Sequence, residues 1–233
     1  MLEGDYFKRA AAEFVGVFAL IFVAAGGAVY ARTPTDLALA NGLVIAVMVS
    51  AVAVISGGHI NPAVTLGFVV TRRIAPALAV VYWIAQFGAA ALAALLLKWV
   101  LPAEAQNAGH LGVPTLGSSI SSGVGVVVEA VLTFFLVWVV FATAVDERGA
   151  FKQVAGLAIG FVIAFDVLMA YAITGAAMNP ARAFGPQLAG DHWANWWVWY
   201  VGPFAGGVIA AAVYELIYLR PSRPAPLESA PAE

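Results

Sequence analysis

Asparagine and proline occur together twice in this sequence, in two Asn-Pro-Ala motifs separated by 118 residues, about half of the chain. The first motif is Asn61-Pro62-Ala63 and the second is Asn179-Pro180-Ala181. Each is a favourable helix start, because an asparagine side chain caps free backbone N–H groups and proline fits the first helical position. The amide groups are uncharged hydrogen-bond donors and acceptors, so this chemistry suits contact with small neutral polar molecules.

Other residues recur at matched distances from the two motifs. Glu13 precedes the first motif's asparagine by 48 residues, and Glu129 precedes the second motif's asparagine by 50. Phe87 follows the first asparagine by 26 residues, and Phe204 follows the second by 25. One Asn-Pro-Ala motif carries little weight by itself, but two copies with matched landmarks indicate an internal repeat.

The composition places the chain in a membrane. Hydrophobic residues make up 63% of the sequence and charged residues only 10%, whereas a soluble domain has about 25% charged residues. Too few charges remain to cover a water-exposed surface, so the apolar excess must face lipid. The net charge of −2 argues against binding to nucleic acid. The lack of cysteine excludes disulfides, a thiolate nucleophile and a zinc-thiolate site.

Six apolar stretches are long enough to cross a bilayer as helices of about 20 residues. We expect these spans at residues 8–30, 37–56, 77–100, 124–145, 154–174 and 194–219. Most basic residues fall on one side of this arrangement: Lys8, Arg9, Arg72, Arg73, Arg148, Lys152, Arg220 and Arg223. Arg32 and Lys98 fall on the other side, so the positive-inside rule predicts cytoplasmic termini. Residues 221–233 have no apolar run and are predicted to be a disordered cytoplasmic tail.

Each half of the chain holds three spans and one short segment that begins at its motif. The short segments, 61–70 and 179–188, would each reach about 15 Å as helices, half of the hydrocarbon thickness. Because three spans is an odd number, the second half enters from the opposite side, as an inverted-topology repeat. We therefore predict an all-α membrane protein with six transmembrane helices and two half-helices. One domain covers residues 1–220, with repeats at about 8–100 and 124–219.

The segments before the two half-helices predict a pore. They are Gly57-Gly58-His59-Ile60 and Gly175-Ala176-Ala177-Met178. Irregular backbone at membrane depth is tolerated only along a water-filled path, so their carbonyl oxygens would be acceptors there, with the two asparagine amides as donors. The half charge at each helix N-terminus would repel a cation by about 1.7 kcal/mol at 5 Å. His59 could gate this path with pH, or it could be a neutral pore-lining or packing residue.

These features together resemble the aquaporin (major intrinsic protein) family. The resemblance rests on residues 56–65 and 179–186 and on Gly202-Pro203-Phe204, and it covers about residues 8–219. It implies a right-handed bundle of six helices, a passive pore in each protomer and a homotetramer in the lipid bilayer. It implies no cofactor, no metal site and no catalysis.

By the same resemblance, Arg182 is the arginine of the selectivity filter. Spacing from the motifs assigns Asn41, Val167 and Ala176 to the other three filter positions. Water-selective members carry an aromatic residue and a histidine where this chain has Asn41 and Val167. A wider constriction is therefore expected, open to glycerol, urea, ammonia or undissociated metalloid hydroxides.

Two other positions resemble water channels instead. Ala183 stands where glycerol facilitators carry aspartate, and Trp199-Tyr200 resembles the aromatic pair of water channels. The two sets of signals conflict. We favour water permeability with passage of some small neutral solutes.

Three buried acids remain to be explained. Glu13 and Glu129 hold matched places in the two halves and are expected to accept backbone N–H groups from the irregular segments. Asp166 lies within the apolar fifth span, and two interpretations are open. It is either a pore-edge carboxylate that pairs with Arg182 or Asn41, or a group buried against neighbouring helices.

Two other classes of function compete with a channel. A secondary transporter also uses inverted repeats and broken helices, and it would use Asp166 for proton coupling. An intramembrane enzyme has little support, because the chain has three histidines, no H-E-x-x-H motif and no Ser–His arrangement. The sequence favours a passive channel for water and small neutral solutes in the cell membrane, with both termini cytoplasmic.

Overall fold

The computed structural model describes residues 5–149 and 152–220, and within them every regular element is a helix. The predicted tail at 221–233 and Arg223 lie outside the described residues. Within these two ranges, six helices are long and apolar enough to cross a membrane: Tyr6–Tyr30, Pro34–Ser56, Pro76–Val100, Ser122–Val145, Lys152–Thr174 and Val198–Leu219. The predicted all-α fold with six spans is thereby confirmed.

Several spans combine α-helix with a short turn of another helix type. The spans are α1 (Tyr6–Leu20) with η2 (Ile21–Ala25) and α2 (Gly26–Tyr30), α3 (Pro34–Ser56), α5 (Pro76–Val100), α7 (Ser122–Val140) with η4 (Phe141–Val145), η5 (Lys152–Val154) with α8 (Ala155–Thr174), and α10 (Val198–Tyr214) with η6 (Glu215–Leu219). The half-helices are α4 (Pro62–Val70) and α9 (Pro180–Gly190). A short helix, α6 (Ala103–Gly109), and the turn η3 (His110–Gly112) connect α5 to α7.

Local sequence explains where the helices next to the motifs begin and end. The helix α3 starts with a capping box, in which the Thr33 hydroxyl accepts from the Asp36 N–H and the Asp36 carboxylate accepts from the Thr33 N–H. It ends at Ser56 and is followed by Gly57, with φ of 92°, whereas α8 ends at Thr174 and is followed by Gly175, with φ of 79°. Glycine adopts these left-handed angles without a steric penalty, so both spans stop directly before the irregular segments.

The observed elements differ from the prediction at two places. The last span begins at Val198 rather than at residue 194, because residues 193–197 form tight turns in which the Trp196 and Val198 N–H groups bond to the Trp193 and Asn195 carbonyls. This stretch is rich in tryptophan and therefore looks like helix by hydropathy alone. The helix α6 was not predicted, because it is short and has no apolar periodicity.

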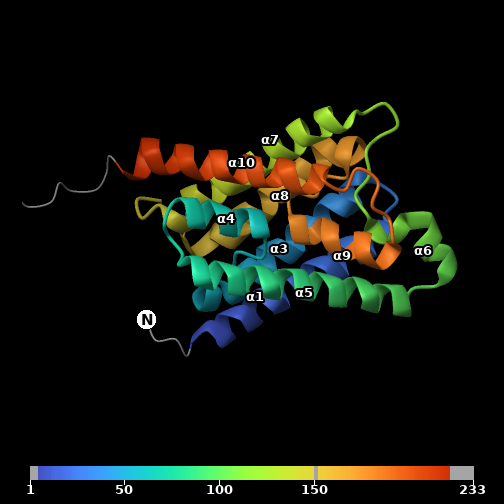
Figure 1. Cartoon of the computed structure of the whole chain (residues 1–233), viewed down its shortest axis with the longest axis horizontal. Coiled ribbons are helices and arrows are strands. Elements are labelled where there is room, and N and C mark those ends of the chain that lie inside the picture. The colour runs from blue at the N-terminus through green and yellow to red at the C-terminus, as the bar shows by residue number, and fades with distance from the viewer. Residues whose placement is uncertain (1–4, 150–151, 221–233) are drawn as a thin grey trace, which may run out of the picture.

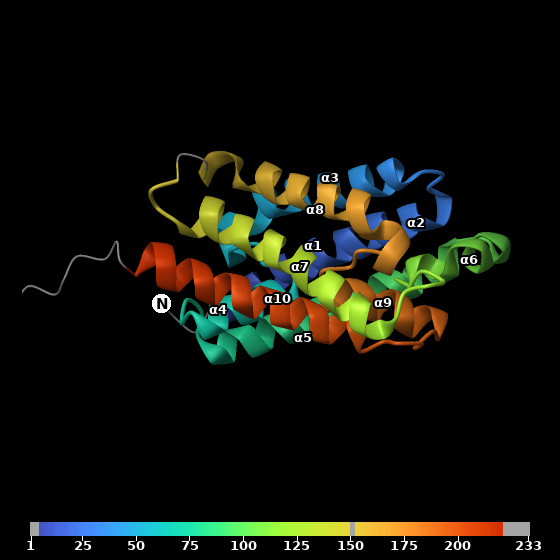
Figure 2. The same ribbon diagram turned by 90° about the horizontal axis from the view of Figure 1, so that it is seen from above.

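The long helices run side by side, and the two half-helices lie between them, pointing toward opposite ends of the bundle (Figures 1 and 2). The helix α3 packs along α8, and α7 packs along α10. Glycines permit this close approach. A Cβ added at Gly160 would lie 2.4 Å from the Gly42 carbonyl oxygen, and one added at Gly206 would lie 2.0 Å from the Ala130 carbonyl oxygen.

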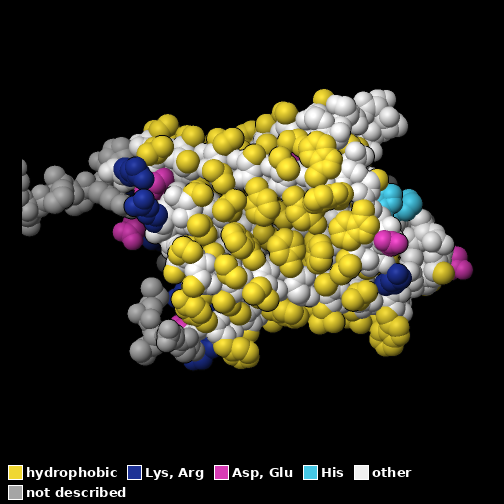
Figure 3. Space-filling view, viewed as in Figure 1, with side chains coloured by type: hydrophobic (Ala, Val, Ile, Leu, Met, Phe, Trp, Pro, Cys, Tyr) yellow, Lys and Arg dark blue, Asp and Glu magenta, His cyan; other side chains and the backbone are white. Residues whose placement is uncertain are grey.

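Apolar side chains cover the middle of the molecular surface, and basic side chains gather mainly at one end (Figure 3). This end carries the first and last described residues and the loops with Arg72, Arg73, Arg148 and Lys152 (Figure 1). We call it the basic face. The end that carries Arg32, α6 and His192 is called the opposite face. The apolar band between the two faces is the surface expected to contact lipid.

Replacement of Gly206 by alanine tests the close packing of α10 on α7. The added methyl group cannot fit without a backbone shift, so the free energy of unfolding should fall by about 1–3 kcal/mol. Unfolding of the purified protein in detergent, followed by circular dichroism, measures this loss. Gly88→Ala is the matched control, because a Cβ at Gly88 meets nothing within 4 Å. Equal stability of the two variants would contradict the packing argument.

Candidate pore

The two half-helices begin at the asparagines of the two motifs. Asn61 caps α4, because its Oδ1 accepts from the Ala63 N–H at 2.8 Å. Asn179 caps α9 in the same way, and its Oδ1 accepts from the N–H groups of Ala181 at 3.0 Å and Arg182 at 3.3 Å. The asparagine oxygens therefore satisfy N–H groups that a helix start leaves free.

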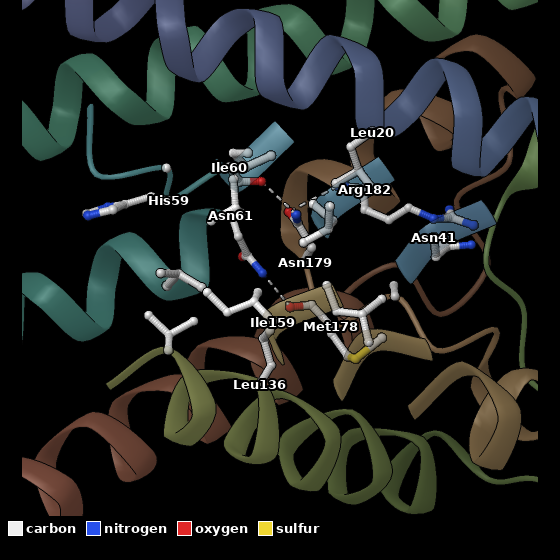
Figure 4. A pocket seen from close by; sticks show the side chains of 17 residues that line it. Leu20, Asn41, His59, Ile60, Asn61, Leu136, Ile159, Met178, Asn179 and Arg182 are labelled. Carbon is white, nitrogen blue, oxygen red and sulfur yellow. Dashed lines mark hydrogen bonds between the residues drawn. The ribbon is translucent and has the colours of Figure 1, made fainter. Parts of the chain in front are cut away.

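The asparagine nitrogens join the two halves of the chain. Asn61 Nδ2 donates to the Met178 carbonyl oxygen at 2.9 Å, and Asn179 Nδ2 donates to the Ile60 carbonyl oxygen at 2.9 Å. Figure 4 shows both bonds in the centre of the site. Each half-helix start is therefore held by the residue that precedes the other half-helix. One N–H of each amide is used in this exchange, and the second N–H is available to a molecule in the cavity.

Several residues of the irregular segments adopt left-handed backbone angles. Gly58 has φ of 64°, and three residues with side chains, Ile60, Ala176 and Met178, have φ between 48° and 53°. Such angles cost a residue with a Cβ roughly 1–2 kcal/mol. The surrounding hydrogen bonds must therefore hold these residues in place.

Two buried glutamates provide those hydrogen bonds. Glu13 accepts from the backbone N–H groups of His59 at 2.9 Å and Ile60 at 2.6 Å, and also from Ser56 Oγ and Gln86 Nε2. The carboxylate is fully buried. Its contacts satisfy the irregular backbone at a depth where water is scarce.

Glu129 occupies the matching place in the second half. It accepts from the backbone N–H groups of Ala177 at 3.0 Å and Met178 at 2.7 Å, and from Thr174 Oγ1 at 2.6 Å. It is fully buried as well. Glu13 has an additional partner in Gln86, whereas Pro203 occupies about the same place in the second half. The two networks thus differ by one donor.

A narrow cavity lies between the motifs and connects two wider ones. The central cavity has about 30 Å³ of water-accessible volume, enough for about two water molecules. Its polar lining comprises Asn41, His59, Asn61, Asn179 and Arg182. Its apolar lining comprises Leu20, Ile45, Val49, Ile60, Val64, Leu136, Val140, Ile159, Ile163, Ala177 and Met178. The cavity therefore has polar groups on one side and a hydrocarbon wall elsewhere.

The two wider cavities are vestibules that share lining residues with the central one. The opposite-face vestibule has about 390 Å³ and shares Arg182 with it. The basic-face vestibule has about 470 Å³ and shares His59 and several aliphatic residues with it. The three cavities together form a path that is wide at both ends and narrow in the middle.

Arg182 and Asn41 lie together at one end of the central cavity (Figure 4). Arg182 donates through one guanidinium nitrogen to the Gly112 carbonyl oxygen at 2.8 Å, while its buried Nε has no partner among the described residues. Asn41 Nδ2 donates to the Leu37 carbonyl oxygen at 2.8 Å. This bond leaves Asn41 Oδ1 as the amide atom that can accept a hydrogen bond.

The other two residues assigned to the filter are placed differently. Val167 and Ala176 are buried, and neither is among the residues that line the central cavity or the two vestibules. Asp166 is also buried, and its Oδ2 has no hydrogen-bond partner among the described residues. Within that part of the chain, no hydrogen bond or ion pair of Asp166 with Arg182 or Asn41 is found.

His59 lies at the other end of the central cavity (Figure 4). Its Nδ1 is 3.0 Å from Thr65 Oγ1, and that hydroxyl donates its only hydrogen to the Asn61 carbonyl oxygen at 3.1 Å. When the Thr65 hydrogen lies on that carbonyl, a neutral His59 donates from Nδ1 and leaves Nε2 as an acceptor. The ring also packs against Phe68, with 4.3 Å between ring centroids and 40° between the ring planes.

At the basic face, an ion pair anchors the residues that follow α7. Arg148 donates two side-chain hydrogen bonds to the Asp146 carboxylate, and the Tyr214 hydroxyl donates a third at 3.1 Å. The hydrogen bonds from the Arg148 guanidinium hold the pKa of the Asp146 carboxyl well below its ordinary value. The contact with Tyr214 ties this loop to α10.

Comparisons with known proteins agree with this geometry. The family described as Major intrinsic protein matches residues 2–214. Aquaporin TIP1-2 of Zea mays is 40% identical over 240 residues, which is 97% of this chain and 92% of that protein. Aquaporin-4 of Mus musculus is 40% identical over 221 residues, 91% of this chain and 68% of that protein. An aquaglyceroporin structure from Plasmodium falciparum superposes with a TM-score of 0.83 at 23% identity, covering 91% of this chain and 96% of that one.

Replacement of Glu129 by glutamine tests the role of the buried carboxylates. An amide has one acceptor oxygen in place of two, so at least one of the Ala177 and Met178 N–H groups loses its partner. The free energy of unfolding should fall by about 1–3 kcal/mol. Thermal unfolding in detergent measures the change. Glu104→Gln, on the exposed first turn of α6, is the control, and a Glu129 variant as stable as this control would refute the assignment.

Proposed function

Because the chain belongs to the major intrinsic protein family, we propose that it is a passive channel for water and small neutral solutes that excludes ions. The observation that carries the proposal is the reciprocal pair of bonds from Asn61 to Met178 and from Asn179 to Ile60. These bonds hold two helix starts on the narrow part of a path that opens into a vestibule at each end.

The lining of the central cavity suits single molecules of water. The free amide hydrogens of Asn61 and Asn179 and the Arg182 Nε–H are donors, whereas Asn41 Oδ1 and His59 Nε2 are acceptors. The aliphatic wall offers no hydrogen bonds, so a water molecule exchanges partners along one side only. Weak binding at several successive places allows rapid passage.

The same arrangement opposes the passage of cations. The N-termini of α4 and α9 each carry roughly half a positive charge, and each raises the energy of a monovalent cation at 5 Å by about 1.7 kcal/mol. Arg182 adds a full positive charge at one end of the cavity. A cation would also have to exchange most of its hydration shell for the aliphatic wall, so its barrier exceeds the sum of these terms.

The size of the cavity bears on the range of solutes. With space for about two water molecules, it favours water over larger molecules. The polar Asn41 in the lining of the cavity favours passage of compact neutral solutes such as urea, ammonia or glycerol. We propose water as the main solute and these compact molecules as secondary ones.

The proposal also covers the domain organisation, the orientation in the membrane and the oligomeric state. One channel domain covers residues 1–220, and its two inverted repeats lie at about 8–100 and 124–219. The gathering of basic residues at one face supports cytoplasmic termini by the positive-inside rule. We propose a homotetramer in the cell membrane, in which each protomer has its own pore.

Stopped-flow light scattering of proteoliposomes under water, urea and glycerol gradients tests the proposal. Wild-type protein should raise water permeability far above that of empty vesicles. Asn41→Phe should lower urea and glycerol permeability at least about tenfold, while water permeability stays within about twofold, because steric exclusion penalises the larger solutes most.

Leu43→Phe is the matched control, since it adds the same ring to an exposed position of the same helix. Wild-type vesicles no more permeable to water than empty ones would exclude the channel function. Unchanged urea and glycerol fluxes in Asn41→Phe would exclude Asn41 from the filter.

A further inference from the structure

A charged residue occupies the same place near the end of the last span in each half of the chain. Lys98 on α5 follows the asparagine of the first motif by 37 residues, and Glu215 at the end of α10 follows the asparagine of the second motif by 36. Charged side chains are rare in this protein, so two of them at matched positions in apolar helices require an explanation.

Lys98 fastens the C-terminal end of α9. Its Nζ donates to the Ala189 carbonyl oxygen at 2.7 Å, one residue before the end of that half-helix. The last carbonyls of a helix have no partner within it and carry about half a negative charge. A lysine at this place both satisfies a free carbonyl and offsets the charge of the helix end.

The corresponding contact at α4 is an ion pair. Glu215 is 3% exposed and accepts from Arg73 through Nε at 2.9 Å and through one terminal nitrogen at 2.7 Å. Arg73 follows the end of α4, and its backbone N–H bonds to the Phe68 carbonyl oxygen in that half-helix. Glu215 therefore holds a cation at the C-terminal end of α4.

Both contacts cross from one half of the chain to the other. Lys98 belongs to the first half and holds α9 of the second, whereas Glu215 belongs to the second half and holds α4 of the first. We call the two contacts the end clasps. Each end clasp is accompanied by a second contact between the two halves of the chain, at a glycine of the half-helix. A Cβ at Gly185 of α9 would lie 2.4 Å from the Ala90 carbonyl oxygen of α5, and one at Gly67 of α4 would lie 3.4 Å from the Gly207 carbonyl oxygen of α10.

We propose that Lys98 is a positioning residue for Arg182, and this inference rests on the proposed channel function. Seven residues separate Arg182 from Ala189, a distance of about 10 Å along the axis of α9. The close contact at Gly185 and the clasp at Ala189 fix the angle and depth of this helix against α5. The Arg182 side chain, on the first turn, then has one position in the wall of the central cavity.

The two end clasps act on different parts of the path. Lys98 controls α9, which carries Arg182 and thus the filter end of the central cavity. Glu215 controls α4, which carries Val64 and Thr65 near the His59 end. Loss of the first clasp loosens the wall that discriminates between solutes. Loss of the second changes the passage of all solutes together.

The test compares Lys98→Met, Lys98→Arg and Glu215→Gln in proteoliposomes, with the ratio of urea to water permeability as the main readout. This ratio does not depend on how much protein folds or inserts. Lys98→Met should raise the ratio of urea to water permeability about threefold. The free energy of a cation at a helix C-terminus corresponds to about this factor in an equilibrium constant. Lys98→Arg should restore the wild-type ratio, and Glu215→Gln should lower both permeabilities while leaving the ratio unchanged.

Arg32→Met is the matched control, because it removes a basic side chain from an exposed position of the same face. A wild-type ratio in Lys98→Met, or an equal rise in Arg32→Met, would overturn the inference while the channel function stands. Wild-type vesicles without water permeability would instead overturn the proposed function itself.

Discussion

Backbone hydrogen bonding at membrane depth is the constraint on which this structure depends. Lipid offers no partner to a free N–H or carbonyl group, yet two segments of this chain leave helical geometry in the middle of the bundle. Glu13 and Glu129 accept the free N–H groups, and Asn61 and Asn179 donate to two of the carbonyls. The acids, the motifs and the glycines next to them are consequences of this single requirement.

The hydrogen bonds that satisfy the irregular backbone also make it rigid. Ile60 and Met178 have left-handed backbone angles, and each is held both through its N–H by a glutamate and through its carbonyl by an asparagine. A residue fixed on both sides cannot relax without loss of two buried hydrogen bonds. The backbone that borders the central cavity is therefore held in one arrangement at these two residues.

Much of this arrangement could be predicted from sequence, because it depends on residue types with strong local preferences. The two motifs, the glycines before them and the length of the apolar stretches predicted six spans and two half-helices close to the observed bounds. The start of the last span was placed four residues early, since hydropathy does not distinguish tryptophan in a turn from tryptophan in a helix.

Other features could not be predicted, because they depend on tertiary contacts. The sequence does not say which aliphatic residues line the cavity, and Ile159 and Ile163 resemble the lipid-facing residues of the same helix. Family spacing assigns Val167 and Ala176 to the filter, but whether they line the cavity depends on the rotation of α8 for Val167 and on the irregular segment after α8 for Ala176. The sequence does not distinguish Lys98 from any other basic residue at a helix end, because its contact with Ala189 is tertiary.

The reciprocal bonds between the motifs also affect biosynthesis. When the ribosome has made the first motif, the residue that accepts the Asn61 amide hydrogen is still 117 positions away. The first irregular segment must therefore wait without its bond to Met178 while three more spans are inserted. The second motif and Arg182 directly after it are the last residues of the cavity lining to be synthesised, and the motif completes both ends of the exchange at once. A chain truncated after the first half therefore contains the whole first motif but lacks Met178, the acceptor that its asparagine needs.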